Sequence, residues 1–81
     1  PFNPVTSIRY DLPSSENVQI SIYDLMGREI RMLVNEHQDA GFRMVQWNAA
    51  NDQGQQVSAG MYIYMIRAGD FRQTRKMVLL K

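Results

Sequence analysis

Hydrolytic or transfer chemistry needs an activated nucleophile beside a base, and this chain offers few side chains for either role. The sequence has one histidine, His37, and no cysteine. His37 stands within the polar stretch 35–39, which is typical of a loop, and the serines fall in predicted strands and turns. We therefore predict that the chain is not an enzyme and has no catalytic residue and no cofactor.

The closest approach to a metal-binding pattern is the segment 48–54, where Asn48, Asn51 and Asp52 precede Gly54. An EF-hand loop needs more carboxylates and a glutamate at its twelfth position, and this segment has neither. Asn, Asp and Gly are also the residues that tight turns require. We predict a turn without a metal here, and a calcium ion bound at 48–54 is the alternative.

The last seven residues could carry recognition chemistry. A basic pair, four apolar residues and a final lysine end the sequence, namely Arg75, Lys76, Met77, Val78, Leu79, Leu80 and Lys81. Chain ends are usually polar and frayed unless something ties them down. This run therefore predicts a terminal strand docked into a sheet, a terminus that another protein recognises, or both. The alternative is that the apolar residues only complete the core.

Size and charge exclude several classes of function. With 81 residues the chain forms one domain, 1–81, with one thin core. The net charge of +1, with basic residues spread along the sequence, argues against nucleic-acid binding. No apolar run approaches the ~20 residues of a membrane span. The start at Pro1-Phe2, without an initiator methionine or a signal peptide, predicts a piece cut from a longer protein.

The elements that must position these residues are strands. Alternation of apolar and polar residues, which is typical of strands with one solvated face, dominates the chain. It predicts strands within 6–12, 18–23, 43–47, 61–67 and 71–80, and the mixed pattern of 29–35 adds a sixth. Turn residues separate these stretches at short intervals. We therefore expect an all-β fold, a small antiparallel β-sandwich of six to seven strands.

One alternative replaces the second and third strands with a single helix. Val18, Ile22, Met26, Ile30 and Leu33 nearly fit a helical stripe. A glycine at position 27, in the middle of that helix, and the clean alternation before it argue against the helix.

The sandwich also predicts which apolar residues are buried. We expect a core that contains Trp47, Val45, Ile20, Ile22, Tyr62, Tyr64 and Ile66. Exposed aromatic residues would instead indicate a sugar-binding platform. Because 61–66 is apolar on both faces, Met61, Ile63 and Met65 are predicted to form an outward row that docks a partner. The alternative is that the segment 35–41 folds over this row.

Several motifs occur in order along the whole chain: PFNP at 1–4, SIRYDLP at 7–13, VQISIYDLMGRE at 18–29, VQW at 45–47, DQG at 52–54, GMYIY at 60–64 and RKMVLLK at 75–81. Together they resemble the type A C-terminal sorting domain of the type IX (Por) secretion system. They are also similar to the Ig-like domain of the flagellar hook-capping protein. The chain departs from the family pattern at Asn48-Ala49, where an Asp-Gly pair often follows the tryptophan.

The resemblance implies an Ig-like sandwich that is a non-catalytic module at the end of a larger secreted protein. In that family, the domain directs cargo from the periplasm of a Gram-negative bacterium across the outer membrane. A sortase-like peptidase then commonly removes it at the cell surface. The implied partners are therefore the type IX machinery, this peptidase and the upstream cargo domain. The implied localisation is secreted or cell surface.

Under this resemblance, residues 75–81 become the predicted sorting signal. An alternative from a different class is an Ig-like accessory module of an extracellular glycoside hydrolase or adhesin, which acts as a spacer or contacts carbohydrate.

Overall fold

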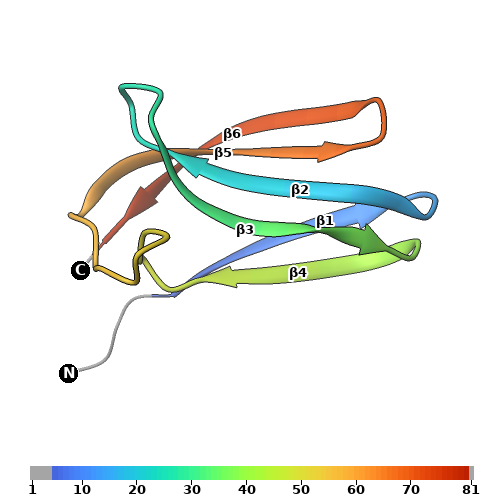
Figure 1. The fold of residues 1–81 in the computed structure, drawn as a ribbon, viewed down its shortest axis with the longest axis horizontal. Helices are drawn as coiled ribbons and strands as arrows, with labels where there is room; N and C mark the ends of the chain where they lie inside the picture. The colour runs from blue at the N-terminus through green and yellow to red at the C-terminus, as the bar shows by residue number, and fades with distance from the viewer. Residues whose placement is uncertain (1–4, 81) are drawn as a thin grey trace.

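The computed structural model describes residues 5–80, which form two antiparallel β-sheets packed face to face (Figure 1). The strands are β1 (Thr6–Leu12), β2 (Glu16–Tyr23), β3 (Glu29–Gln38), β4 (Gly41–Trp47), β5 (Gly60–Ala68) and β6 (Phe71–Leu79). The motif at 1–4 and the final lysine lie outside the described residues. The predicted all-β sandwich of six to seven strands is confirmed, with six strands described.

The two sheets are unequal in width. One sheet has the order β3-β2-β5-β6, and the other contains only β1 and β4 (Figure 1). The chain changes sheet between β1 and β2, between β3 and β4, and again through the long connection 48–59. In a four-over-two sandwich, the narrower sheet covers only part of the wider one. Part of β6 is therefore not covered by the two-stranded sheet.

The core lies where the alternating apolar residues of both sheets meet. Its largest fully buried side chains are Trp47, Ile8, Ile20, Ile22, Leu79 and Val18. Of the residues predicted to be buried, Tyr62 and Ile66 are also buried. Val45 and Tyr64 are instead half-buried and pack against the edge of this cluster. Burial of this apolar surface is the main source of stability in so small a domain.

The alternative of one helix over 18–34 is wrong, because a tight turn divides this segment into two strands. The amide of Gly27 donates to the carbonyl of Asp24 at 3.0 Å, and Gly27 has a φ of +87°. The Asp24 carboxylate accepts hydrogen bonds from the amides of Met26 and Arg28 at 2.9 and 3.0 Å. A non-glycine residue at 27 would be strained in this left-handed conformation.

Two β-bulges explain the mixed periodicity of 29–35. Ile20 is opposite Val34 and Ser21 is opposite Met32, so Leu33 is an extra residue on β3. A second irregularity follows, and it leaves Ile30 without a directly opposite partner. Both extra residues pack against the core. Each bulge shifts the alternation by one residue, so a period-two pattern cannot run unbroken through this strand.

Acid is expected to weaken the turn at 24–28. Hydrogen bonds from the Arg28 backbone and side chain hold the pKa of Asp24 below its usual range. A lowered folded-state pKa contributes stability that is fully present above the unfolded-state pKa, about 3.9, and is lost as the pH falls through the folded value. We expect the wild type to be more stable than Asp24→Asn at pH 7, with the difference shrinking below about pH 4. Urea unfolding of both proteins from pH 7 to pH 2.5 measures this, and a constant difference would contradict it.

Candidate functional site

Within the predicted recognition segment, residues 75–79 form the second half of β6, and Leu80 follows the strand. Met77 lies directly opposite the buried Tyr62 and faces inward, and Leu79 is only 2% exposed. Lys76 lies opposite Ile63, and Val78 lies opposite Met61, so both face outward. Leu80 follows the strand with 75% of its surface exposed. Lys81 lies outside the described residues.

The terminal run therefore has two faces. Leu79 belongs to the core and Met77 packs against it, whereas Lys76, Val78 and Leu80 are open to solvent. Arg75 lies opposite Tyr64, on the inward-facing side of β6, and is nevertheless exposed, because the narrow sheet does not cover this part of the strand. Alternate residues of this strand are thus packed against the core and open to solvent.

Met61, Ile63 and Met65 lie on the outer face of β5, alternating with the inward Tyr62, Tyr64 and Ile66. Met61 is exposed, and the other two are half-buried. Residues 35–38 pair with residues 16–19 of β2, at the opposite end of the sheet from Met61. The outward row continues onto β6 through Val78.

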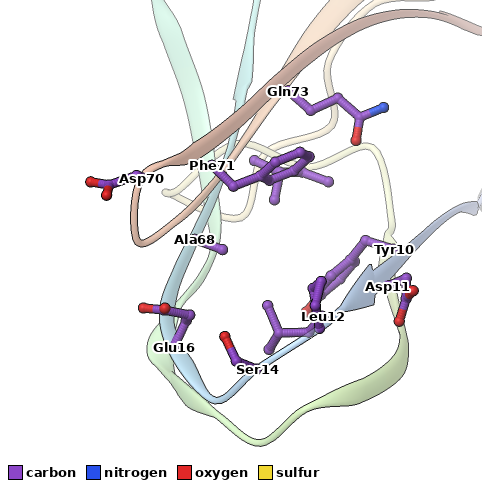
Figure 2. Close-up of a pocket in the computed structure, with 11 residues that line it drawn as sticks. Tyr10, Asp11, Leu12, Ser14, Glu16, Ala68, Asp70, Phe71 and Gln73 are labelled. Carbon is purple, nitrogen blue, oxygen red and sulfur yellow. The ribbon is translucent and has the colours of Figure 1, made fainter.

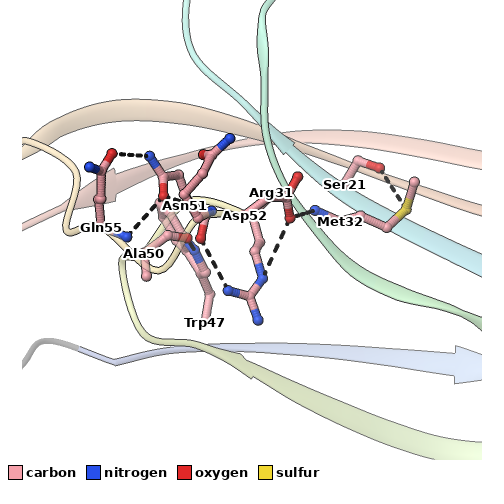
Figure 3. Close-up of polar contacts among 9 residues, drawn as sticks. Ser21, Arg31, Met32, Trp47, Ala50, Asn51, Asp52 and Gln55 are labelled. Carbon is pink, nitrogen blue, oxygen red and sulfur yellow. Dashed lines mark hydrogen bonds and ion pairs between the residues drawn. The ribbon is translucent and has the colours of Figure 1, made fainter.

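Two of the described aromatic residues, Trp47 and Tyr62, are buried in the core. The Trp47 ring is fully buried and meets Tyr62 edge to face, with ring centroids 5.4 Å apart. Its indole Nε1 donates to the Ala50 carbonyl at 2.8 Å (Figure 3). The Tyr62 hydroxyl donates to the Ser58 carbonyl at 2.6 Å. These two rings therefore anchor the connection between β4 and β5, and they present no flat surface to a sugar.

The segment 48–54 uses its polar side chains for turn hydrogen bonds. The Asn51 Oδ1 atom accepts from the amides of Gln53 and Gln55 at 3.0 and 2.9 Å. The Asp52 Oδ1 atom accepts from the Met32 amide at 3.1 Å (Figure 3). The Asp52 amide donates to the Ile30 carbonyl at 3.1 Å. Within residues 5–80, no three His, Cys, Asp or Glu side chains gather as metal ligands would.

The sequence predicts Asp52 as a turn residue, with a metal ligand as the alternative. In the fold it lies at the edge of β3 and bonds to the Met32 amide and the Ile30 carbonyl, as a neighbouring strand would. It also lies 3.9 Å from the Nε atom of Arg31, whose Nη1 atom donates to the Asn51 carbonyl at 3.3 Å. No local sequence signal links these groups, because they come from segments 20 residues apart.

The departure at Asn48-Ala49 has a structural explanation. Ala49 has a φ of +63° and is the single non-glycine residue with positive φ in the described part of the chain. Glycine adopts this conformation without the steric penalty of a Cβ atom. Ala49 is also fully buried, so its methyl group contributes to the core.

His37 lies on the outer face near the end of β3. Its Nδ1 atom is 3.2 Å from the Asn17 Oδ1 atom. The prediction of a loop at 35–39 is wrong for residues 35–38, which belong to β3. No nucleophilic side chain contacts His37 through a hydrogen bond within the described residues, so the structure brings no catalytic pair together there.

A hollow of about 480 Å³ opens where the two-stranded sheet stops short of β6. Figure 2 shows Phe71 and Tyr10 reaching into it from opposite sides, with Leu12 and Ala68 below and Asp70 pointing outward. Phe71 is 54% exposed although it lies opposite the buried Ala68. Burial raises the pKa of the Tyr10 hydroxyl, which donates to the Gln38 Oε1 atom at 2.6 Å. The hollow is the uncovered margin of the core.

These features define the class of module: a small Ig-like β-sandwich with turn-forming polar residues and a two-faced terminal strand. The family model described as the FlgD Ig-like domain matches residues 4–70, and the chain belongs to this family. The match ends just before β6. The domains of this family are non-enzymatic Ig-like modules, and this chain has the same Ig-like fold. The described residues include no helix with the length and hydropathy needed to cross a membrane.

Comparison with solved structures gives the same fold. The crystal structure of FlgD from P. aeruginosa is similar with a TM-score of 0.75 and 20% sequence identity. The similarity covers 94% of this chain and 61% of that chain, so this chain spans less than two thirds of that protein's length. A search of curated proteins found no match.

Proposed function

We propose that this Ig-like module is a C-terminal sorting signal that directs an upstream cargo protein across the outer membrane by the type IX secretion system. The observation that carries the proposal is that side chains of one segment, the end of β6, serve both to pack the strand and to face solvent. Met77 and Leu79 fix the strand in the sheet, whereas Lys76, Val78 and Leu80 are exposed beside them. A receptor can therefore recognise a basic and apolar pattern without unfolding the domain. The motif resemblance along the whole chain supports the same function.

The proposed partners are the type IX machinery, a sortase-like peptidase and the upstream cargo domain. The proposed localisation is secreted or cell surface, reached through the periplasm. The outward row of Met61, Ile63 and Met65 adjoins Val78 and extends the apolar contact area available to the machinery or to cargo. Methionine side chains adapt to partners of different shape, which suits a module that must serve varied cargo.

The alternative, an accessory module of an extracellular glycoside hydrolase or adhesin, receives less support. Carbohydrate contact would need exposed aromatic rings close together. Trp47 and Tyr62 are buried, and the two most exposed aromatic residues of the described part of the chain, Phe42 and Phe71, line different hollows. A spacer role remains consistent with the fold and predicts that changes on the outer face have no effect on export.

Export of a fusion protein tests the sorting function. Residues 1–81 are fused to a periplasmic reporter in a cell that has the type IX apparatus, and surface reporter is measured. Deletion of 75–81 is a poor variant, because it removes the buried Leu79 together with the exposed residues. We expect Lys76→Glu with Val78→Thr to reduce surface reporter to the level of a fusion without the domain, while unfolding is nearly unchanged.

Two further variants complete this test. Arg9→Glu on β1 makes the same charge change as Lys76→Glu on the other sheet and should leave export intact. Met61→Lys with Met65→Lys tests the outward row, and impaired export with normal folding supports it as a docking surface. If this double variant fails to fold, the row is part of the core and that assignment is wrong. Normal export of the Lys76 and Val78 variant would refute the sorting proposal.

A further inference from the structure

The outer face of the four-stranded sheet has a polar half as well as the apolar row. One straight line of outward residues crosses all four strands, because each member lies directly opposite the next: Asn35 on β3, Gln19 on β2, Arg67 on β5 and Arg72 on β6. These residues line a hollow of about 520 Å³ together with Asn17, Glu36 and Gly69. Two guanidinium groups and several amides therefore surround one depression.

Neither arginine forms an ion pair with the one acidic residue that lines the hollow, Glu36. Like charges directly opposite each other on neighbouring strands destabilise a sheet. Within residues 5–80 the ion pairs are Arg28 with Asp24 and Arg31 with Asp52, so neither Arg67 nor Arg72 has one. The lining contains one carboxylate, that of Glu36, which accepts from the Gln38 Nε2 atom at 3.4 Å. An anion between the two guanidinium groups would convert this repulsion into attraction.

The neutral groups of the hollow suit the same ligand. The Gln19 Nε2 atom donates to the Asn35 Oδ1 atom at 3.4 Å, which holds the two amides side by side in the row. Amide N–H groups add hydrogen-bond donors to an anion without adding charge. A planar carboxylate is satisfied by one arginine, whereas a tetrahedral phosphate has enough oxygen atoms and enough charge for two.

We infer that the hollow formed by Arg67, Arg72, Gln19 and Asn35 binds a phosphate group. The two guanidinium groups donate to the phosphate oxygens from adjacent strands, and the amides complete the shell. This site lies away from Lys76, Val78 and Leu80 and does not depend on the sorting function. Phosphate can be supplied as the free ion or as a lipid headgroup, and the chemistry of recognition is the same for both.

Binding to two probes tests the inference. Inorganic phosphate is titrated into the 81-residue chain at constant ionic strength, with amide chemical shifts as the readout. Cosedimentation is measured with phosphatidylcholine vesicles, with and without phosphatidylglycerol. We expect saturable phosphate binding that Arg67→Gln with Arg72→Gln weakens about tenfold or more, since each loses a charge-assisted hydrogen bond. Cosedimentation that requires phosphatidylglycerol and is lost in this variant would identify a headgroup as a source, and phosphate binding alone would identify the free ion.

A control variant separates a site from general electrostatics. Arg9→Gln with Lys76→Gln removes the same charge, with Lys76 on the same face of the sheet, and should change the affinity for phosphate less than about twofold. Equal weakening in both double variants, or no saturable binding of either probe, would overturn the inference. We expect the Lys76→Glu with Val78→Thr variant still to bind phosphate, which keeps this test separate from the test of sorting.

A charge-reversal variant tests whether the loss of phosphate binding could be caused by unfolding. Arg72→Glu places opposite charges on the paired positions 67 and 72, so we expect its melting temperature to rise while phosphate binding is lost. Loss of binding in a more stable protein cannot come from unfolding. If Arg72→Glu binds phosphate as well as the wild type does, the inference is wrong.

Discussion

Replacing Trp47 with alanine is expected to lower the free energy of unfolding by about 3–5 kcal/mol, a large share of the total for so small a domain. The side chain is fully buried at the centre of the sandwich, and its indole N–H donates to the Ala50 carbonyl. Truncation therefore leaves a cavity, removes the edge-to-face contact with Tyr62 and leaves a buried carbonyl without its partner. Urea unfolding followed by circular dichroism measures the change.

Trp47→Phe provides the matched control. It keeps an aromatic ring in the core and loses the hydrogen bond, so its cost should be clearly smaller than that of alanine. A loss below ~1 kcal/mol for Trp47→Ala would mean that the ring does not support the core. The sugar-platform interpretation would then regain support.

The second large effect is expected at the end of β6. Leu79→Ala should cost about 2–5 kcal/mol, because Leu79 is among the most deeply buried side chains although it lies two residues from the chain's last residue. Leu80→Ala, one residue later, should change stability by less than about 0.5 kcal/mol, because this side chain is exposed.

The contrast between these neighbours checks the two-faced description of β6. Thermal and urea unfolding of both variants give the comparison. Equal effects at 79 and 80 would mean that the strand is frayed or shifted by one residue. A one-residue shift would turn Lys76 and Val78 inward and remove the basis for recognition at the outer face.

The alternation of apolar residues was sufficient to predict most of the fold. It identified the strands around Ile20, Ile22 and Trp47, because one solvated face leaves a period-two pattern. It overestimated burial at Val45 and Tyr64. The number of strands in the opposite sheet and the place of the residue in its own sheet decide how well such residues are covered. The periodicity of one strand does not reveal that the opposite sheet has only two strands.

The polar sites were harder to predict, because they depend on pairing between distant strands. Asp52 meets the Met32 amide through a contact that spans 20 residues, and the sequence around either residue gives no sign of it. The phosphate hollow likewise exists only once the register places Gln19 beside Arg67 and Arg67 beside Arg72. The net charge of the whole chain, +1, does not reveal this local excess of positive charge.

The hydrogen bonds of Asp52 to β3 also decide how copies of this domain can stack. An open sheet can lengthen from either outer strand, as a polymer can grow from both ends. At β3, Asp52 already occupies the amide of Met32 and the carbonyl of Ile30, so a strand added along the whole of that edge would have to displace it. The opposite end of the sheet is β6, which carries the positive charges of Arg72, Arg75 and Lys76, and repulsion between these charges in two copies opposes their pairing. If only β6 is open, two copies can pair β6 to β6 and form a closed dimer but not a fibre, and high salt, which screens that repulsion, would favour the pairing.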